Sequence, residues 1–188
     1  MIDSALEFIN DQLNQFLTIN FGLDDEVTVL NNLVESNGSE PLQNQNKVII
    51  TLINLEQETA KQFYGGQVRS GDQVATMSPA VHFNLDVLVT ASFDNYNESL
   101  KFLTSAVGYF QANNVFNRKN QPSMPEGIEA LHFEIENTPY EKTHNLWSAL
   151  GAKYQPSIIY KVRHVTVQSE QVHTTVKSVE HTTGQAIP

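Results

Sequence analysis

The chain has 188 residues, of which 40% are hydrophobic, so it is long enough and apolar enough to bury a core within one domain. Its formal net charge of -10 repels a phosphate backbone, and we therefore expect no nucleic-acid partner. It contains no cysteine, which excludes disulfides, thiolate nucleophiles and cysteine-based zinc sites.

The sequence carries neither a membrane span nor the pattern of a secretory signal. Its longest apolar runs, such as residues 48–50 and 87–89, are far shorter than the ~20 residues that cross a bilayer. Asp3 stands where a secretory signal would carry basic residues, and no apolar segment of a signal follows it. We therefore expect synthesis in the cytoplasm and no direct insertion into a membrane.

The first residues predict a helix and then a strand. A stripe of apolar residues at helical spacing covers residues 2 to 20, and Gly22 is its C-terminal stop. Val27 and Val29 indicate a strand that could extend to Leu33. The residues of the stripe are Ile2, Leu6, Ile9, Leu13, Phe16 and Leu17.

The next segment predicts the centre of a sheet. After a polar turn at residues 36–41, residues 47–55 are rich in β-branched side chains and too apolar to face water, which indicates a central strand. Residues 56–78 contain three glycines and no clean period, which predicts a long functional or mobile loop.

A strand with one wet face is expected at residues 81–92. The polar residues His82, Asn84 and Asp86 alternate there with apolar ones, which is the period of a half-buried strand. Asp86 is then a surface residue or the partner of a basic residue in the preceding loop. The candidate partners are Lys61 and Arg69.

A second helix and another strand follow. Residues 94–97 offer N-caps for a helix that runs to about Asn113. A loop at residues 113–127 separates this helix from a strand at residues 128–135, whose Phe133 side is expected to face inward.

The last helix and strand of the domain have clear boundaries. Thr138 and Glu141 form a capping-box pattern, with a proline between them at the first helical position, and the helix is expected to end near Leu150. Gly151 is its C-terminal stop, and residues 157–167 alternate imperfectly as a last strand.

Together these elements predict an α/β (α+β) fold with a single mixed sheet flanked by about three helices. We expect a compact domain at residues 1–168 and an extended C-terminal arm at residues 169–188. The arm carries Val172, Val176 and Val179, which is enough for an edge strand but too little apolar area to fold alone. We therefore expect the arm to be disordered in the isolated subunit and ordered on a partner.

The residues show no catalytic or metal-binding pattern. The six histidines lack the H-x-x-x-H and H-E-x-x-H spacings of a helical zinc site; only His164 and His173 could meet, across a hairpin. The glycines at 65–71 lack the ending of a phosphate loop, and no serine lies in a nucleophile elbow. The acidic run at residues 24–26 is typical of a solvated loop. We expect no cofactor, no metal and no enzyme activity.

The stretch near the C-terminus carries a family resemblance. Residues 146–157, LWSALGAKYQPS, precede Tyr160, Lys161, Val162 and Arg163, and residues 79–111 have a similarly familiar order. The sequence resembles the cap, or tail-terminator, proteins of phage-tail-like extracellular contractile injection systems, of the Photorhabdus virulence cassette and antifeeding prophage type. The resemblance covers about residues 2 to 167, and none of its motifs is catalytic.

The resemblance implies a structural subunit of a bacterial particle. Such a subunit would form a six-fold ring that closes the distal end of the inner tube and contractile sheath, with a C-terminal arm that pairs with sheath strands. Its partners would be other copies of itself, the sheath protein and the tube protein. The particle would assemble in the bacterial cytoplasm and then be released or be anchored to a membrane through other subunits.

The residues expected to form interfaces or to set the architecture lie in this stretch and in the arm. Trp147 and Leu150 give the last helix an apolar anchor, and Pro156 fixes the start of the last strand, so their role in function is indirect. The full set is Trp147, Leu150, Gly151, Tyr154, Pro156, Tyr160, Arg163, Val172, Val176 and Val179.

Two other functions remain open at this point. The chain could be a small monomeric adaptor or binding protein that uses the loop at residues 56–78. It could also be an acid–base hydrolase that uses His82, Asp86 and His132, although only the presence of these residue types favours that function.

Overall fold

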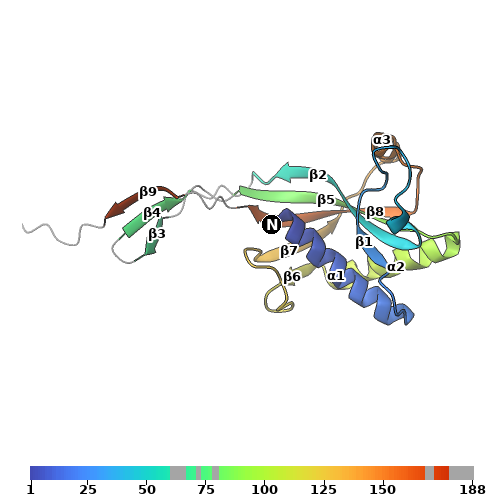
Figure 1. Ribbon diagram of the computed structural model, residues 1–188, viewed down its shortest axis with the longest axis horizontal. Coiled ribbons are helices and arrows are strands. Elements are labelled where there is room, and N and C mark those ends of the chain that lie inside the picture. The colour runs from blue at the N-terminus through green and yellow to red at the C-terminus, as the bar shows by residue number, and fades with distance from the viewer. Residues whose placement is uncertain (60–66, 71–72, 78–80, 168–171, 178–188) are drawn as a thin grey trace, which may run out of the picture.

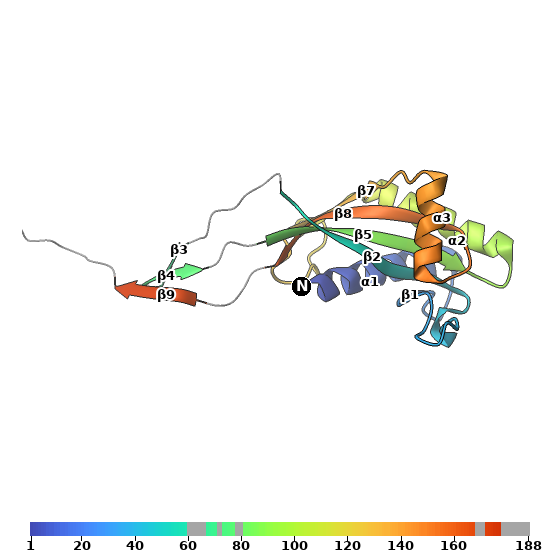
Figure 2. The same cartoon turned by 90° about the horizontal axis from the view of Figure 1, so that it is seen from above.

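The protein has a body built on one curved sheet and a smaller sheet beyond the end of that body (Figures 1 and 2). The computed structural model describes residues 1–59, 67–70, 73–77, 81–167 and 172–177. The helices are α1 (Ile2–Phe21), the short 3-10 helix η1 (Leu42–Asn44), α2 (Tyr96–Ala112) and α3 (Tyr140–Leu150). The strands of the body are β1 (Thr28–Leu30), β2 (Lys47–Gln57), β5 (Val81–Ser92), β6 (Val115–Asn117), β7 (Ala130–Ile135) and β8 (Ser157–Val167).

The body strands form one six-stranded mixed sheet in the order β1-β2-β5-β8-β7-β6. Strands β1 and β2 run parallel, and the other neighbours run antiparallel. This arrangement confirms the predicted class, a mixed sheet flanked by three helices. In the described part of the chain, β3 (Gln67–Ser70), β4 (Gln73–Met77) and β9 (Val172–Lys177) form a second sheet in the order β3-β4-β9.

The main core lies between the sheet and helices α1 and α2. The apolar stripe predicted for α1 packs into this core, where Leu13 and Leu17 are fully buried. Gly22 ends α1 in the left-handed conformation, with φ of 62°, as its position predicted. Phe110 of α2 stacks on Phe133 of β7 with ring centroids 4.6 Å apart. The predicted inward face of β7 is therefore confirmed.

Helix α3 covers the opposite face of the sheet, as Figures 1 and 2 show. Trp147 of α3 forms a smaller apolar cluster there with Leu33, Ile49 and Leu88. Leu33 belongs to this cluster from the loop after β1, because β1 ends at Leu30. The sheet therefore has apolar side chains packed against both of its faces.

The prediction that one face of β5 is exposed to solvent was wrong. Asn84 is 6% exposed and Asp86 is 9% exposed, because β5 lies in the middle of the sheet between β2 and β8. The negative charge of the buried Asp86 is balanced by a lysine on β8, because Lys161 Nζ lies 3.8 Å from Asp86 Oδ1. The candidate partners in the preceding loop are not needed for this pairing, and their side chains lie outside the described residues.

The prediction of a long loop at residues 56–78 was also wrong in part. Strand β2 continues to Gln57, and β3 and β4 pair as antiparallel neighbours within that segment. Strand β9 then pairs with β4, with Val176 opposite Val74. The small sheet lies beyond the ends of β2, β5 and β8 (Figure 1).

Three smaller expectations need correction. Strand β2 is second from the edge of the sheet and not central. Its last residues are exposed because β1 pairs only with residues 48–50 of β2. The loop after α2 contains the short strand β6. Helix α3 begins without the capping box: its N-cap is Pro139, and the Thr138 hydroxyl donates to the Glu136 carbonyl oxygen at 3.4 Å.

Tyr160 lies in the core, and its ionisation should limit stability in alkali. The side chain is 2% exposed, its hydroxyl has no hydrogen-bond partner among the described residues, and burial raises the pKa of Tyr160 to about 12. Because the folded protein holds the phenol proton more tightly than the unfolded chain, the related stability is fully present below the unfolded pKa of 10.0. It is lost as the pH rises from 10.0 towards 12. The loss can reach about 2–3 kcal/mol.

Tyr160→Phe is therefore expected to unfold at nearly the same denaturant concentration as the natural chain at pH 7. It should be the more stable of the two at pH 11, because phenylalanine cannot ionise. Equilibrium unfolding at both pH values measures the difference. An equal loss of stability in both proteins between pH 7 and pH 11 would contradict the assignment to Tyr160.

Candidate interaction surface

Trp147 is the centre of a partly open surface on the α3 side of the sheet. It is 5% exposed, and within the described residues it is the one buried residue of α3. Its ring meets that of Tyr154 edge to face, with centroids 5.5 Å apart. Gly151, with φ of 67°, ends the helix between them and turns the chain back across the indole. The apolar anchor expected from the sequence is therefore present.

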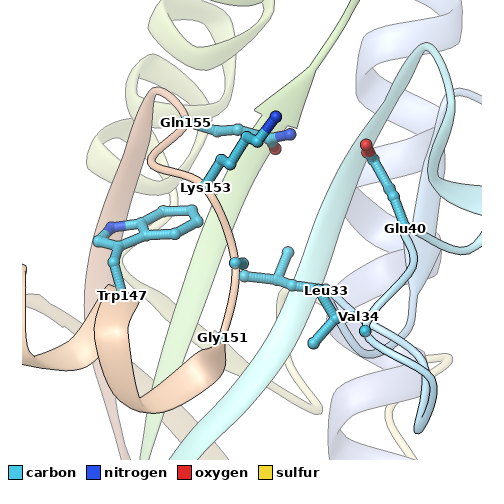
Figure 3. A pocket seen from close by; sticks show the side chains of 9 residues that line it. Leu33, Val34, Glu40, Trp147, Gly151, Lys153 and Gln155 are labelled. Carbon is cyan, nitrogen blue, oxygen red and sulfur yellow. The ribbon is translucent and has the colours of Figure 1, made fainter.

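A cavity of about 320 Å³ lies on one side of the indole. Figure 3 shows Trp147 on one wall and Leu33, Val34 and Glu40 on the other, with Lys153 across one end. The buried Nε1 of Trp147 has no hydrogen-bond acceptor in the described part of the chain. A well-packed interior leaves few such groups.

A second and larger cavity, of about 730 Å³, lies along α3 beside Trp147. Its rim carries two tyrosines that face solvent: Tyr140 is 85% exposed and Tyr154 is 67% exposed. The full lining is Thr138, Tyr140, Thr143, His144, Trp147, Ser148, Ala152 and Tyr154. We call this cavity the α3 groove.

The segment after Gly151 is tied to β5. The amide of Ala91 donates to the carbonyl oxygen of Pro156 at 3.0 Å. Gln155 Nε2 donates to Ser92 Oγ at 3.2 Å, and that hydroxyl donates to Glu40 at 2.9 Å. Pro156 therefore stands where β8 begins, as expected.

Beyond α3 the same face of the sheet carries two ion-pair groups. Lys161 Nζ lies 2.9 Å from Glu56 Oε2, and the same ammonium reaches the buried Asp86. The hydrogen bond to Glu56 raises the pKa of Lys161 above its usual value, and the charge of Asp86 acts in the same direction. We call Lys161, Glu56 and Asp86 the lysine cluster.

Arg163 forms the second group. Its Nε donates to Glu134 Oε2 at 2.9 Å, and its Nη1 lies 3.6 Å from Glu58 Oε2. Together with the lysine cluster, Arg163 links β2, β5, β7 and β8 near the end of the body from which the small sheet emerges (Figure 2). Sequence reasoning missed these links, although Lys161 and Arg163 alternate on β8 as Asn84 and Asp86 do on β5.

The other expected interface residues lie in separate places. Tyr160 points into the main core and does not contribute to the α3 surface. Leu150 is partly buried against the Trp147 cluster. Val172 and Val176 lie on β9, opposite Met77 and Val74 of β4, and Val179 lies outside the described residues. The expected residues thus fall into one group around Trp147 and another on β9, while Tyr160 and Arg163 lie apart from both.

The described residues contain no group of three or more histidine or acidic side chains placed to hold a metal ion. Strand β9 pairs with β4 and not with β8, so His164 and His173 do not face each other across the hairpin considered above. Within the same described part of the chain, none of the helices is both long enough and apolar enough to cross a bilayer.

Comparison with known proteins identifies the family, although no curated protein sequence matches the chain. The fold is similar to that of the PVC sheath/tube terminator of an extracellular contractile injection system in its extended state, with 12% identity and a TM-score of 0.66 over 100% of this chain and 64% of that one. It is also similar to the tube-terminating cap of the anti-feeding prophage AFP, with 11% identity and a TM-score of 0.59 over 95% of this chain and 60% of that one.

The chain thus spans less than two thirds of the length of these solved relatives, and at such identities the likeness concerns the fold. The sequence itself matches a family model, the Pvc16 N-terminal domain, over residues 5–181. This match begins within α1 and extends beyond β9, so it includes both sheets, α2 and α3. It confirms the resemblance found in the sequence, and the chain belongs to the Pvc16 N-terminal domain family.

Proposed function

We propose that the chain is a structural cap, or terminator, at the end of the tube and sheath of an extracellular contractile injection system, and that it is not an enzyme. The proposal rests on the family match and on a fold shared with two solved proteins that are named as terminators, over 100% and 95% of this chain. The acidic run at residues 24–26 is exposed, and Asp86 is buried in an ion pair with Lys161, so neither is placed as an accessible acid–base pair.

The cap is proposed to act as a six-fold ring of identical subunits. A ring that matches the symmetry of a tube contacts every subunit of the terminal layer equally, which stops further addition there. Exposed apolar side chains on both faces of the body give such a ring contact surfaces; they include Ile19, Leu100, Tyr140 and Tyr154. Tube and sheath proteins of the same particle are the other proposed partners, and assembly takes place in the bacterial cytoplasm.

Residues 1–168 are proposed to form the ring, and residues 169–188 to act as an arm towards the sheath. Among the described strands, β9 lies at one edge of the small sheet, and the backbone of an edge strand can pair with a strand of another chain. Val172, Val176 and Val179 are the side chains proposed to meet that partner. The order of the arm in the free subunit remains a prediction that limited proteolysis can test.

The two other functions lose their structural basis. The adaptor relied on a long loop at residues 56–78, and that segment instead contains the β3–β4 pair and the end of β2. The hydrolase relied on Asp86 as an accessible acid, and Asp86 is buried beside Lys161.

The test is electron microscopy of particles from cells that lack this chain, beside cells in which it is restored. We expect tubes and sheaths of variable length, or particles that fall apart, without the chain, and uniform particles with it. The mass of the purified chain, measured by light scattering, should in addition reveal rings. Uniform particles of normal length without the chain would rule out a terminator.

A further inference from the structure

The α3 groove suits a partner surface that presents an apolar side chain bordered by acidic residues. Aromatic rings of Tyr140, Trp147 and Tyr154 line it, and no carboxylate belongs to its lining. Two exposed lysines stand next in sequence to lining residues: Lys142 precedes Thr143, and Lys153, which also lines the smaller cavity, lies between Ala152 and Tyr154. Glu141 is the neighbouring acid. An aromatic groove of this kind on a protein surface is typical of a binding site.

A projection with the matching chemistry lies at the C-terminal end of α1. Ile19 is 74% exposed and Leu23 is 39% exposed, although the other face of α1 is buried. The exposed acidic run at residues 24–26 follows directly, and the last turn of α1 has no basic residue. The helix dipole adds to this negative charge. We call Ile19, Leu23 and residues 24–26 the α1 knob.

The knob and the groove belong to opposite faces of the sheet. Helices α1 and α2 cover one face and α3 covers the other (Figures 1 and 2). One copy therefore presents its knob on the side opposite its own groove. Contact between two different surfaces of identical subunits is head to tail, and it generates a closed ring when the rotation closes. Contact of the knob with another knob would bring together two acidic runs.

We propose that, in the ring, the α1 knob of one copy docks in the α3 groove of the next copy. This inference rests on the proposed cap function and specifies its subunit contact. Ile19 and Leu23 supply the apolar group for the aromatic groove, and the acidic run lies against Lys142 and Lys153. The second copy is the occupant favoured by the complementary charges and by the placement of both surfaces on one chain.

Site-specific crosslinking tests the contact, because the chain has no cysteine of its own. Particles are assembled with the double variant Ile19→Cys/Tyr140→Cys and treated with a short bismaleimide. We expect a ladder of covalent oligomers that ends at the ring. Each single variant should stay monomeric, since a single cysteine has no counterpart at a head-to-tail contact. Both positions are exposed, so the fold is expected to be unaffected.

Charge reversal gives an independent readout. Asp24→Lys/Asp25→Lys is expected to lower ring formation at least tenfold, and Lys142→Glu/Lys153→Glu should do the same. Combining all four changes should restore rings, which loss of folding could not do. The matched control, Lys119→Glu, reverses an exposed charge on the β6–β7 loop and should form rings normally.

The outcomes separate this inference from the cap function. Particles that contain rings but give no ladder with the double variant would overturn the knob-and-groove contact and leave the cap in place. Covalent dimers from a single-cysteine variant would show like-with-like contact and would also overturn it. Particles that never incorporate the chain would overturn the proposed function itself.

Discussion

Replacing Trp147 by alanine is expected to lower the free energy of unfolding by about 3–5 kcal/mol, the range measured for large aromatic residues removed from a core. The side chain is 5% exposed and joins α3 to Leu33, Ile49 and Leu88. Because no other residue of α3 is buried in the described structure, the helix should also lose its attachment to the sheet. Denaturant unfolding followed by circular dichroism measures the global effect.

Hydrogen exchange can locate the same effect. Amides of α3 are expected to exchange much faster in Trp147→Ala, while those of α1 should be slowed by the main core as before. Trp147→Phe is the matched control, because it keeps an aromatic ring and removes the unpartnered N–H; it should cost less than about 1.5 kcal/mol. Equal losses in the two variants would show that ring volume at this position does not hold α3.

Elements with a strong local period could be predicted from the sequence. Strand β8 has the bounds expected for it, and α1 differs by one residue, because each buries an apolar pattern of the proper spacing. Gly22 and Gly151 mark two helix ends because the left-handed conformation costs glycine little. The Trp147 anchor was predictable for a similar reason, since the large apolar residues Trp147 and Leu150 on an otherwise polar helix must pack against something.

Features that depend on distant residues could not be predicted in this way. Alternation on β5 shows which residues are polar, but only the pairing with β8 reveals that Asp86 is buried beside Lys161. The hairpin of β3 and β4 lacks an apolar period, because it belongs to a small sheet completed by β9 from the other end of the chain. Period alone therefore could not distinguish it from a loop.

The α3 groove illustrates the same limit for the candidate site. Tyr140 and Tyr154 are ordinary residues in the sequence, and their exposure follows from how α3 lies on the sheet. Lys142 and Lys153 stand beside lining residues of the groove on the two sides of Gly151, where α3 ends. The sequence indicates that this region matters, and tertiary packing decides which side chains remain available to a partner.

Replacing Lys161 by methionine is expected to cost about 3 kcal/mol at pH 7, which is the lower end of the effects of breaking a buried ion pair. Methionine keeps most of the apolar stem but leaves the carboxylate of Asp86, 9% exposed, without its cation. Lys101→Met is the matched control. Its bond to Glu98 is 2.8 Å long, close to the 2.9 Å between Lys161 and Glu56, but both partners are exposed. It should cost less than about 1 kcal/mol.

The pH dependence of the Lys161→Met effect distinguishes an ion pair from lost packing. The hydrogen bond to Glu56 raises the pKa of Lys161 above 10.5, so the folded state binds the proton more tightly than the unfolded chain. The resulting stability is complete below pH 10.5 and is lost as the pH rises through the folded pKa. The difference between natural chain and variant should therefore be constant from pH 7 to 9 and shrink above pH 10.5. A difference that stays constant in alkali would indicate that the lysine stem, and not its charge, joins these strands.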